Sequence, residues 1–314
     1  MNRLRAIAGQ CFRASSPIFR WYVRHFPSVL THRGVVRRTD IALSHRDHRF
    51  VTRTIYGFRC AGTTQDLIQR YIYLFGVWEA NLSSWIRSAL KPGDVFVDVG
   101  ANIGFFSLLA SQIVGSEGRV VSIEPSPTIF AQLTANVALN RVGNIRLVNC
   151  AASDQSRTVR IFRGLDRNLG ATSVFDDVGF HYEGEVAALP LTAILSPEET
   201  GRMRFVKIDV EGLEIDVVMG LLPLLRSAPR DLNVIVEVGG GPKGSPTASE
   251  SANRIVPQLA KEGFHVYQIE NTHDPLANRV GRVIDPSAIN GECDLIFSRR
   301  DALAAVFSRA PDLP

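Results

Sequence analysis

Residues 95–107 read VFVDVGANIGFFS, and this stretch decides the fold class of the chain. The β-branched and aromatic run at 95–99 is typical of a buried parallel strand. Asp98 interrupts that run just before two glycines, and residues 105–114 then have the pattern of an apolar helix. A strand, a glycine turn and a helix start predict a cradle for a nucleotide-like cofactor. Glycine lets the backbone approach a ligand closely, and the helix N-terminus offers free N–H groups.

Length and composition are those of an ordinary globular protein. At 314 residues the chain can bury a full α/β core and carry an appended segment. The four cysteines form no CxxC pair, which argues against a disulfide framework or a zinc site and favours a reducing compartment. No apolar run reaches the roughly 20 residues that a membrane span needs. We therefore expect a cytoplasmic protein.

The net charge of +4 is distributed unevenly along the chain. Residues 1–39 hold eight arginines and no acid, so the remainder carries a net charge of +4 minus +8, or −4. An acidic body argues against a nucleic-acid substrate. The basic segment has three interpretations: an extension that packs through its aromatic side chains, a helix lying peripherally on an anionic membrane, at the inner surface, or a transit peptide.

Apolar runs and amphipathic stretches alternate from residue 95 onward, which predicts a doubly wound, mostly parallel sheet. Further strands are expected at 119–123, 145–150, 159–162, 205–209, 234–238, 265–269 and 295–298, with helices at 128–140, 214–225 and 251–261. The last two strands have no helix between them, which suits an antiparallel closing strand. Before residue 95 we expect a strand at 50–56 and a helix at 66–84. The polar, glycine-rich residues 163–185 are expected to form a long loop or lid.

Three carboxylates, Asp98, Glu124 and Asp209, stand at the carboxyl ends of expected strands, the sheet edge where ligands bind. Glu124 could accept hydrogen bonds from both ribose hydroxyls of an adenosine. The glycines at 100 and 104 lack the G-x-G-x-x-G spacing of a pyrophosphate site, and Asp98 would repel a phosphate. S-adenosylmethionine, with an ammonium, a sulfonium and no phosphate, fits this pattern better.

Five motifs then resemble a known family. They are Phe96-Val-Asp-Val-Gly-Ala-Asn-Ile-Gly, Ile123-Glu-Pro, Asn136-Val-Ala-Leu-Asn, Ala151-Ala-Ser-Asp and Val206-Lys-Ile-Asp-Val-Glu-Gly-Leu-Glu. Together, over residues 73–298, they resemble the FkbM family of S-adenosylmethionine-dependent methyltransferases. The resemblance implies a class I methyltransferase (Rossmann-like) α/β domain over 73–300, after a basic extension and lead-in over 1–72 and before a tail over 301–314. It also implies O-methylation of a hydroxyl on a carbohydrate, glycolipid or secondary metabolite.

The resemblance also implies which residues bind the cofactor. Asp98, Gly100, Asn102 and Gly104 would line its methionine and ribose side, and Glu124 would hold the ribose. Asp154 would border the adenine, where it either holds the amino group or serves only as a turn or N-cap residue.

An alcohol acceptor must lose a proton during methylation, so a carboxylate beside the methyl donor is expected. Asp209 is the first candidate, as base or as acceptor-orienting group, and Glu211 is the second. Lys207 is expected to be buried as their ion partner. Glu237 could join Asp209 around the acceptor, or the two could hold a divalent cation. With no histidine nearby, we expect no metal.

Two other functions could use such a sheet. One is a nicotinamide- or nucleotide-sugar-dependent enzyme, against which the missing third glycine counts. The other is a non-catalytic interaction module, against which the intact acids at 98, 124 and 209 count. The expected partner is a small-molecule, glycan or glycolipid acceptor.

Overall fold

The computed structural model describes residues 20, 21, 24, 43–45, 47–164, 172–174, 180–239, 241, 243–269, 280–283 and 285–299. The chain divides into two compact units, Met1–Trp78 and Glu79–Pro314. The boundary lies a few residues beyond the domain start expected at residue 73. The expected tail at 301–314 lies outside the described residues.

From residue 47 onward, where the structure describes it continuously, the first unit contains a β-hairpin followed by a helix. Strand β1 (Arg49–Arg53) pairs antiparallel with β2 (Arg59–Thr63), and α3 (Leu67–Phe75) follows. The strand expected at 50–56 corresponds to β1, its partner β2 was not predicted, and the unbroken helix expected at 66–84 was wrong. The helix ends because Gly76 adopts a left-handed conformation with φ 74°, and a new helix begins after Trp78.

The described part of the basic N-terminal segment packs through arginines. The Arg24 guanidinium donates to the carbonyls of Arg53, Ile72, Tyr73 and Leu74, and so satisfies the last turn of α3. The Arg20 guanidinium lies 4.2 Å from the centre of the Tyr73 ring, whereas Trp21 is 54% exposed. Trp21 is the segment's one aromatic residue among those that the structure describes, so packing through aromatic side chains stays a prediction. The membrane and transit interpretations concern residues outside the described part of the chain, and the membrane contact stays a prediction.

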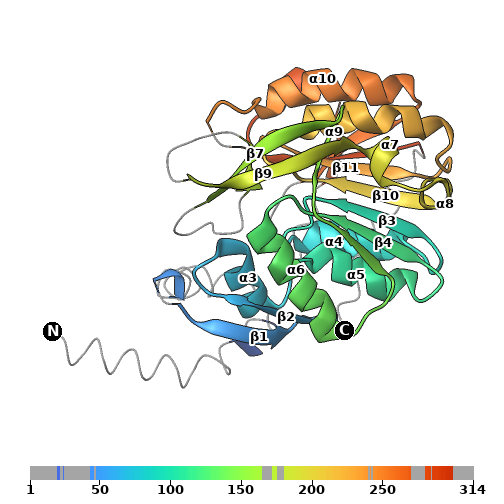
Figure 1. The fold of residues 1–314 in the computed structure, drawn as a ribbon. Coiled ribbons are helices and arrows are strands. Elements are labelled where there is room, and N and C mark those ends of the chain that lie inside the picture. Colours follow the sequence, from blue (N-terminus) through green and yellow to red (C-terminus); the bar gives the residue numbers. More distant parts are fainter. Residues whose placement is uncertain are drawn as a thin grey trace, which may run out of the picture. The chain divides into compact units, whose positions relative to one another are not determined.

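The second unit is built on a mixed sheet in the order β13-β12-β14-β11-β10-β3-β4-β5 (Figure 1). The strands are β3 (Val95–Val99), β4 (Arg119–Ile123), β5 (Ile145–Val148), β10 (Met203–Ile208), β11 (Asn233–Val238), β12 (His265–Ile269), β13 (Val280–Arg282) and β14 (Cys293–Ser298). Strands β11, β10, β3, β4 and β5 are parallel, and β14 runs antiparallel to both β11 and β12. The predicted doubly wound, mostly parallel sheet with an antiparallel closing strand is confirmed.

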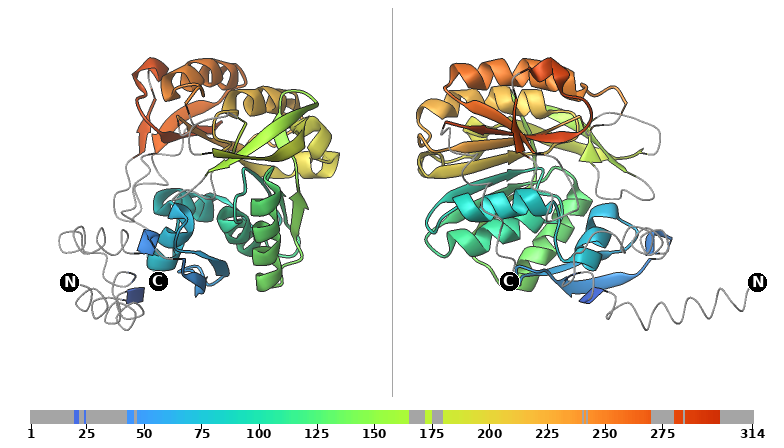
Figure 2. Two further views of the ribbon diagram at one scale, coloured as in Figure 1. Left: turned by 60° about the vertical axis from the view of Figure 1, so that its left-hand side comes forward. Right: turned by 180° about the vertical axis from the view of Figure 1, so that it is seen from behind.

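Helices cover both faces of this sheet (Figures 1 and 2). One face carries α4 (Ala80–Ala89), α5 (Phe105–Val114) and α6 (Pro127–Asn140), and the other carries α9 (Glu214–Leu221) and α10 (Ala248–Lys261). The short helices are α7 (Leu191–Ile194), α8 (Pro197–Gly201), η1 (Leu222–Arg226) and η2 (Pro286–Ala288). Every residue of β3 is buried, which explains its continuous apolar run. None of the described helices has both the length and the apolar character to cross a membrane.

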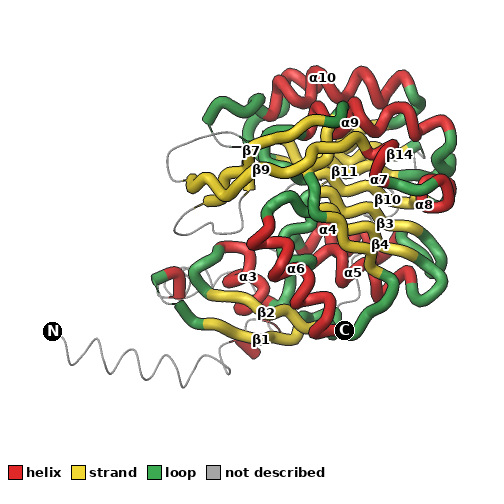
Figure 3. Tube along the Cα trace, viewed as in Figure 1, coloured by secondary structure: helices red, strands yellow, loops and turns green. Residues whose placement is uncertain are grey.

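A second, smaller sheet has the order β6-β9-β7-β8. Its strands β7 and β9 are labelled in Figure 3. Its strands are β6 (Ala151–Ser153), β7 (Arg157–Gly164), β8 (Thr172–Ser173) and β9 (Phe180–Pro190). We call the antiparallel pair β7 and β9 the ribbon. The expected loop at 163–185 is wrong at both ends, because β7 extends to Gly164 and β9 begins at Phe180. Polar residues stand in β9 because much of this strand is exposed.

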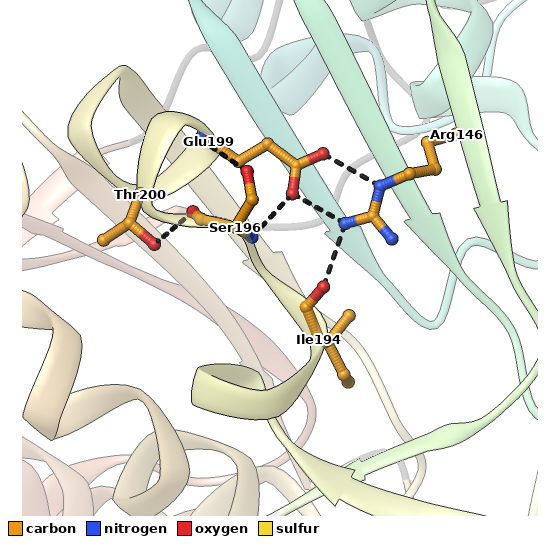
Figure 4. A network of polar contacts seen from close by, with 5 residues as sticks. All are labelled: Arg146, Ile194, Ser196, Glu199 and Thr200. Carbon is orange, nitrogen blue, oxygen red and sulfur yellow. Dashed lines mark hydrogen bonds and ion pairs between the residues drawn. The ribbon is translucent and has the colours of Figure 1, made fainter.

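An ion pair fixes α8 to the edge strand β5 (Figure 4). The Nε and Nη2 atoms of Arg146 donate to the two carboxylate oxygens of Glu199 at 2.8 and 2.7 Å. Nη2 also donates to the carbonyl of Ile194 at 3.0 Å, and Glu199 accepts from the backbone N–H of Ser196 within a capping box. The bidentate geometry holds residues 194–201 against this side of the sheet.

Candidate active site

The turn after β3 is fixed against the end of β4. The backbone N–H groups of Gly100 and Ala101 both donate to the Ile123 carbonyl, at 2.9 and 3.0 Å. Gly100 has φ +80°, and a Cβ there would lie 1.7 Å from the backbone oxygen of Asp209. Only glycine fits at this position. The predicted cofactor turn therefore touches the loop that carries the candidate catalytic acids.

Glu124 is held rigidly beside the same turn. Its side chain is buried, with 3% exposure, and its two oxygens accept from the backbone N–H groups of Asn102 at 3.0 Å and Ser126 at 2.9 Å. Burial raises the pKa of Glu124 to about 8, although both N–H groups act to lower it. A carboxylate has about four acceptor positions, so this one can still accept hydrogen bonds from ribose hydroxyls.

Asp98 lies beneath the turn. It is 1% exposed, and its Oδ2 accepts from the Ser107 hydroxyl at 2.5 Å, which in turn accepts from the Ser122 hydroxyl at 2.7 Å. Burial raises the pKa of Asp98, and the nearby Lys207 opposes that rise. Asn102, with φ 50°, completes the turn in a left-handed conformation. The sequence had predicted Asp98 on the methionine side of the cofactor, and that role stays a prediction.

Lys207 stands at the centre of the carboxylates. It is 2% exposed, and its Nζ lies 2.7 Å from Oδ2 of Asp209 and 4.9 Å from the centre of the Phe106 ring. Burial disfavours its charge, but Asp209 and then Glu79 raise the pKa of Lys207 above its ordinary value. The lysine is thus a buried cation that fixes Asp209, in the arrangement expected from the sequence.

Glu211 occupies the turn between β10 and α9. It has φ 52°, and its carbonyl accepts from the Ser173 hydroxyl of β8 at 3.3 Å. Burial and then the charge of Asp209 raise the pKa of Glu211 to about 8. A carboxyl group with this pKa can take up and release a proton near neutral pH.

Three more carboxylates lie close to these groups, and the sequence had singled out only part of this set. Glu237 of β11 pairs in register with Asp294 of β14, which is fully buried. Burial and then the charge of Asp294 raise the pKa of Glu79 well above its ordinary value, and burial and then Asp209 do the same for Glu237. Asp294 could have been found from the sequence, because it is an acid at the start of the apolar run of β14. The excess of carboxylates suits a cationic ligand.

Two sequence-based alternatives receive no support from these contacts. Asp154 lies 3.5 Å from Arg157, which also pairs with Asp216, and its backbone packs near Gly220 of α9. These contacts favour the turn role that was left open beside an adenine contact. No group of carboxylate, histidine and cysteine side chains among the described residues has the geometry to hold a metal ion, so nothing supports a cation between Asp209 and Glu237.

The family model described as "Methyltransferase FkbM domain" matches residues 98–266, which is more than half of the chain. The chain belongs to the FkbM methyltransferase family. The matched range includes the turn after β3, Glu124 and the Lys207–Glu214 segment. The family resemblance predicted from the motifs is confirmed, and the nicotinamide and nucleotide-sugar alternatives are left without support.

Individual relatives agree with the family assignment. The chain is 30% identical over 177 residues to the 31-O-demethyl-FK506 methyltransferase FkbM of Streptomyces tacrolimicus, covering 48% of this chain and 66% of that protein. It is 24% identical over 161 residues to the methyltransferase sdnD of Sordaria araneosa, covering 42% of this chain and 62% of that protein. The chain thus spans less than two thirds of the length of these relatives. The structure of Aeropyrum pernix fibrillarin in complex with S-adenosylmethionine aligns with 15% identity and a TM-score of 0.40, covering 70% of this chain and 76% of that one.

S-adenosylmethionine is the cofactor of the FkbM family, and the residues of the site fit it. Gly100 leaves no room for a side chain in the turn, and Glu124, held by two backbone N–H groups, keeps acceptor positions for hydroxyl groups. The surrounding groups are carboxylates with a single lysine, which Asp209 already neutralises. A sulfonium and an ammonium would favour the ionised form of these carboxyl groups, whereas a pyrophosphate would disfavour it.

Proposed function

We propose that this protein is an S-adenosylmethionine-dependent O-methyltransferase that acts on a hydroxyl of a carbohydrate, glycolipid or secondary metabolite. The observation that carries the proposal is the contact between Gly100 and the backbone oxygen of Asp209. Because of this contact, the turn that would hold the methyl donor adjoins the loop that carries two carboxylates. Methyl transfer needs that proximity, since the donor and the acceptor must be aligned.

S-adenosylmethionine, when bound, supplies a sulfonium methyl group, whose carbon bonds the acceptor oxygen while the carbon–sulfur electron pair returns to sulfur. The acceptor hydroxyl then has a proton to lose, and Glu211, with a pKa of about 8, would take it. Asp209, fixed by Lys207 at 2.7 Å, would accept a hydrogen bond from the hydroxyl and orient it. The sequence analysis had Asp209 first, as base or as acceptor-orienting group, and Glu211 second; here Asp209 takes the orienting role and Glu211 is the base.

Two features support an uncharged hydroxyl acceptor. Carboxylates accept hydrogen bonds from hydroxyl groups, and they would repel a phosphorylated or carboxylated molecule. The Streptomyces tacrolimicus relative is named for methylation at an oxygen, which supports oxygen as the acceptor atom in this chain as well.

The donor site is tested by heat stabilisation with S-adenosylhomocysteine. Wild-type protein should melt at a higher temperature in its presence, and Glu124→Ala should lose most of that shift because the ribose contact is gone. Glu198→Gln is the matched control, since its side chain is 80% exposed on α8. An equal shift in wild type and Glu124→Ala would contradict the assignment of Glu124.

Turnover is tested with S-adenosylmethionine carrying a deuterated methyl group, incubated with cell extract and analysed by mass spectrometry for newly labelled products. Glu211→Gln should lower kcat by roughly 100-fold, as expected for loss of a general base, without weakening S-adenosylhomocysteine binding. Asp209→Asn separates the two roles. If Asp209→Asn lowers kcat by this amount and Glu211→Gln does not, Asp209 is the base instead. No labelled product with any extract would favour a non-catalytic module.

A further inference from the structure

Glu183 lies at an irregularity in the ribbon. Along β7 and β9, Ile161 pairs with Gly184 and Phe162 pairs with Tyr182, so Glu183 has no partner in the register. This is a β-bulge, in which two residues of one strand face one residue of the other. Bulges turn a side chain away from its regular direction and are frequent beside active sites. Here the bulge directs Glu183 to the N-terminus of α6.

At that N-terminus, Glu183 and Glu124 converge on one serine. The Ser126 hydroxyl donates to Oε2 of Glu183 at 2.6 Å, while the Ser126 backbone N–H donates to Oε1 of Glu124 at 2.9 Å. Oε1 of Glu183 also accepts from the Thr128 N–H at 3.3 Å. Prolines flank Ser126 on both sides and have no N–H. Ser126 is therefore the residue through which this segment fixes both carboxylates.

The contact is shielded from solvent. Ser126 is fully buried, Glu124 is 3% exposed, and the side chain of Glu183 is 11% exposed. The charge of Glu183 acts on Glu124 and raises its pKa, although by less than burial does. Arg163 of β7 lies 3.6 Å from Glu183 on the other side and partly balances it. Electrostatic interactions at such a site are stronger than at an exposed surface.

We propose that Glu183 is a positioning residue for cofactor binding: from the bulge in β9 it fixes Ser126, and through Ser126 it holds Glu124 in the geometry that receives the ribose. This proposal rests on the proposed function, in which Glu124 is the ribose-binding group. The ribbon and the cofactor site are then linked, so that each stabilises the bound geometry of the other. Because coupling between two sites is reciprocal, cofactor binding should protect the backbone amides of the ribbon from hydrogen exchange. Loss of Glu183 should in turn weaken cofactor binding.

The test measures the Kd of S-adenosylhomocysteine by calorimetry for wild type, Glu183→Ala and Glu183→Gln. Glu183→Ala should bind about tenfold more weakly, within the usual range for coupled sites. Glu183→Gln keeps an oxygen that accepts from the Ser126 hydroxyl, so it should recover most of the affinity. Glu185→Ala is the matched control, because Glu185 stands on the same strand but is exposed, and its Kd should equal that of wild type.

Two further measurements distinguish positioning from general stabilisation. Hydrogen exchange of the β9 amides should slow on addition of S-adenosylhomocysteine in wild type and Glu185→Ala, but not in Glu183→Ala. Ser126→Ala combined with Glu183→Ala should lose less affinity than the two single variants lose together, because both remove the hydrogen bond from the Ser126 hydroxyl to Glu183. Wild-type affinity in Glu183→Ala, or additive losses in the double variant, would overturn the proposal. Failure of wild type to bind S-adenosylhomocysteine would instead overturn the proposed function.

Discussion

The close packing of Gly100 against the backbone of Asp209 yields a quantitative prediction. In Gly100→Ala the new Cβ would lie 1.7 Å from the Asp209 backbone oxygen, whereas real contacts of this kind are at least 3.0 Å. The turn or the β10 loop must therefore move by about 1.3 Å. Neither partner is the end of a flexible side chain, so the displacement falls on the backbone.

Two costs add in this variant. A left-handed conformation costs a residue other than glycine about 1–2 kcal/mol. Overpacking in a filled interior costs about 1–3 kcal/mol more, so the free energy of unfolding should fall by roughly 2–5 kcal/mol. Binding should suffer as well, because a site generally has to be held within about 0.5 Å of its productive geometry.

Gly263→Ala separates the two costs. Gly263 has φ +84°, nearly the value at Gly100, but a Cβ there would meet nothing within 4 Å. Guanidinium unfolding of both variants should therefore show a loss of about 1–2 kcal/mol for Gly263→Ala, the conformational cost alone. The Kd of S-adenosylhomocysteine should rise at least tenfold in Gly100→Ala and stay unchanged in Gly263→Ala. If the two variants lose equal stability and bind equally well, the close packing of the turn against Asp209 does not control the site.

Two other predictions concern stability. Burial raises the pKa of Glu124 and Glu211 to about 8 and of Glu214 to about 7, from 4.5, so the folded protein keeps protons that the unfolded chain has already released. The melting temperature without cofactor should consequently fall as the pH rises from 5 to 8 and level off above, and a rise over this range would contradict the burial of these carboxyls. Arg146→Met, which breaks the bidentate pair with Glu199, should lose about 1–3 kcal/mol in guanidinium unfolding. Its S-adenosylhomocysteine affinity should equal that of wild type, and an unchanged unfolding midpoint would show that the pair is not stabilising.

The sequence predicted best the elements whose pattern is local. The run at 95–99 is β3 residue for residue, and the strand expected at 265–269 is β12. Of the ribbon, β7 was predicted in part, as the strand at 159–162, whereas β9 was missed because its first half, residues 180–185, is mostly polar and partly exposed. The helix break before Glu79 was missed because Gly76 and Glu79 adopt left-handed conformations in a stretch that has no proline to mark the end.

The residues of the site likewise divide into those that a local sequence pattern marks and those that depend on tertiary pairing. Glu124 and Asp209 were predictable because each follows an apolar strand, and such strand ends meet at one edge of a parallel sheet. Asp294 reaches the site only because β14 runs antiparallel beside β11, which places it opposite Glu237. Glu183 reaches α6 only because of a bulge. Register and bulges depend on tertiary pairing, which a single strand's sequence does not specify.

The position of β14 also constrains how the protein is made. This strand lies between β11 and β12 in the sheet, although it follows both in the chain. During synthesis β11 can join β10 as soon as it emerges, but its other edge stays open until residues 293–298 exist. An open edge of this kind, rich in valine and isoleucine, is where nascent chains associate with one another. We expect ribosome-bound chains lacking β14 to need a chaperone at this edge, and the released chain to close it by inserting a single strand.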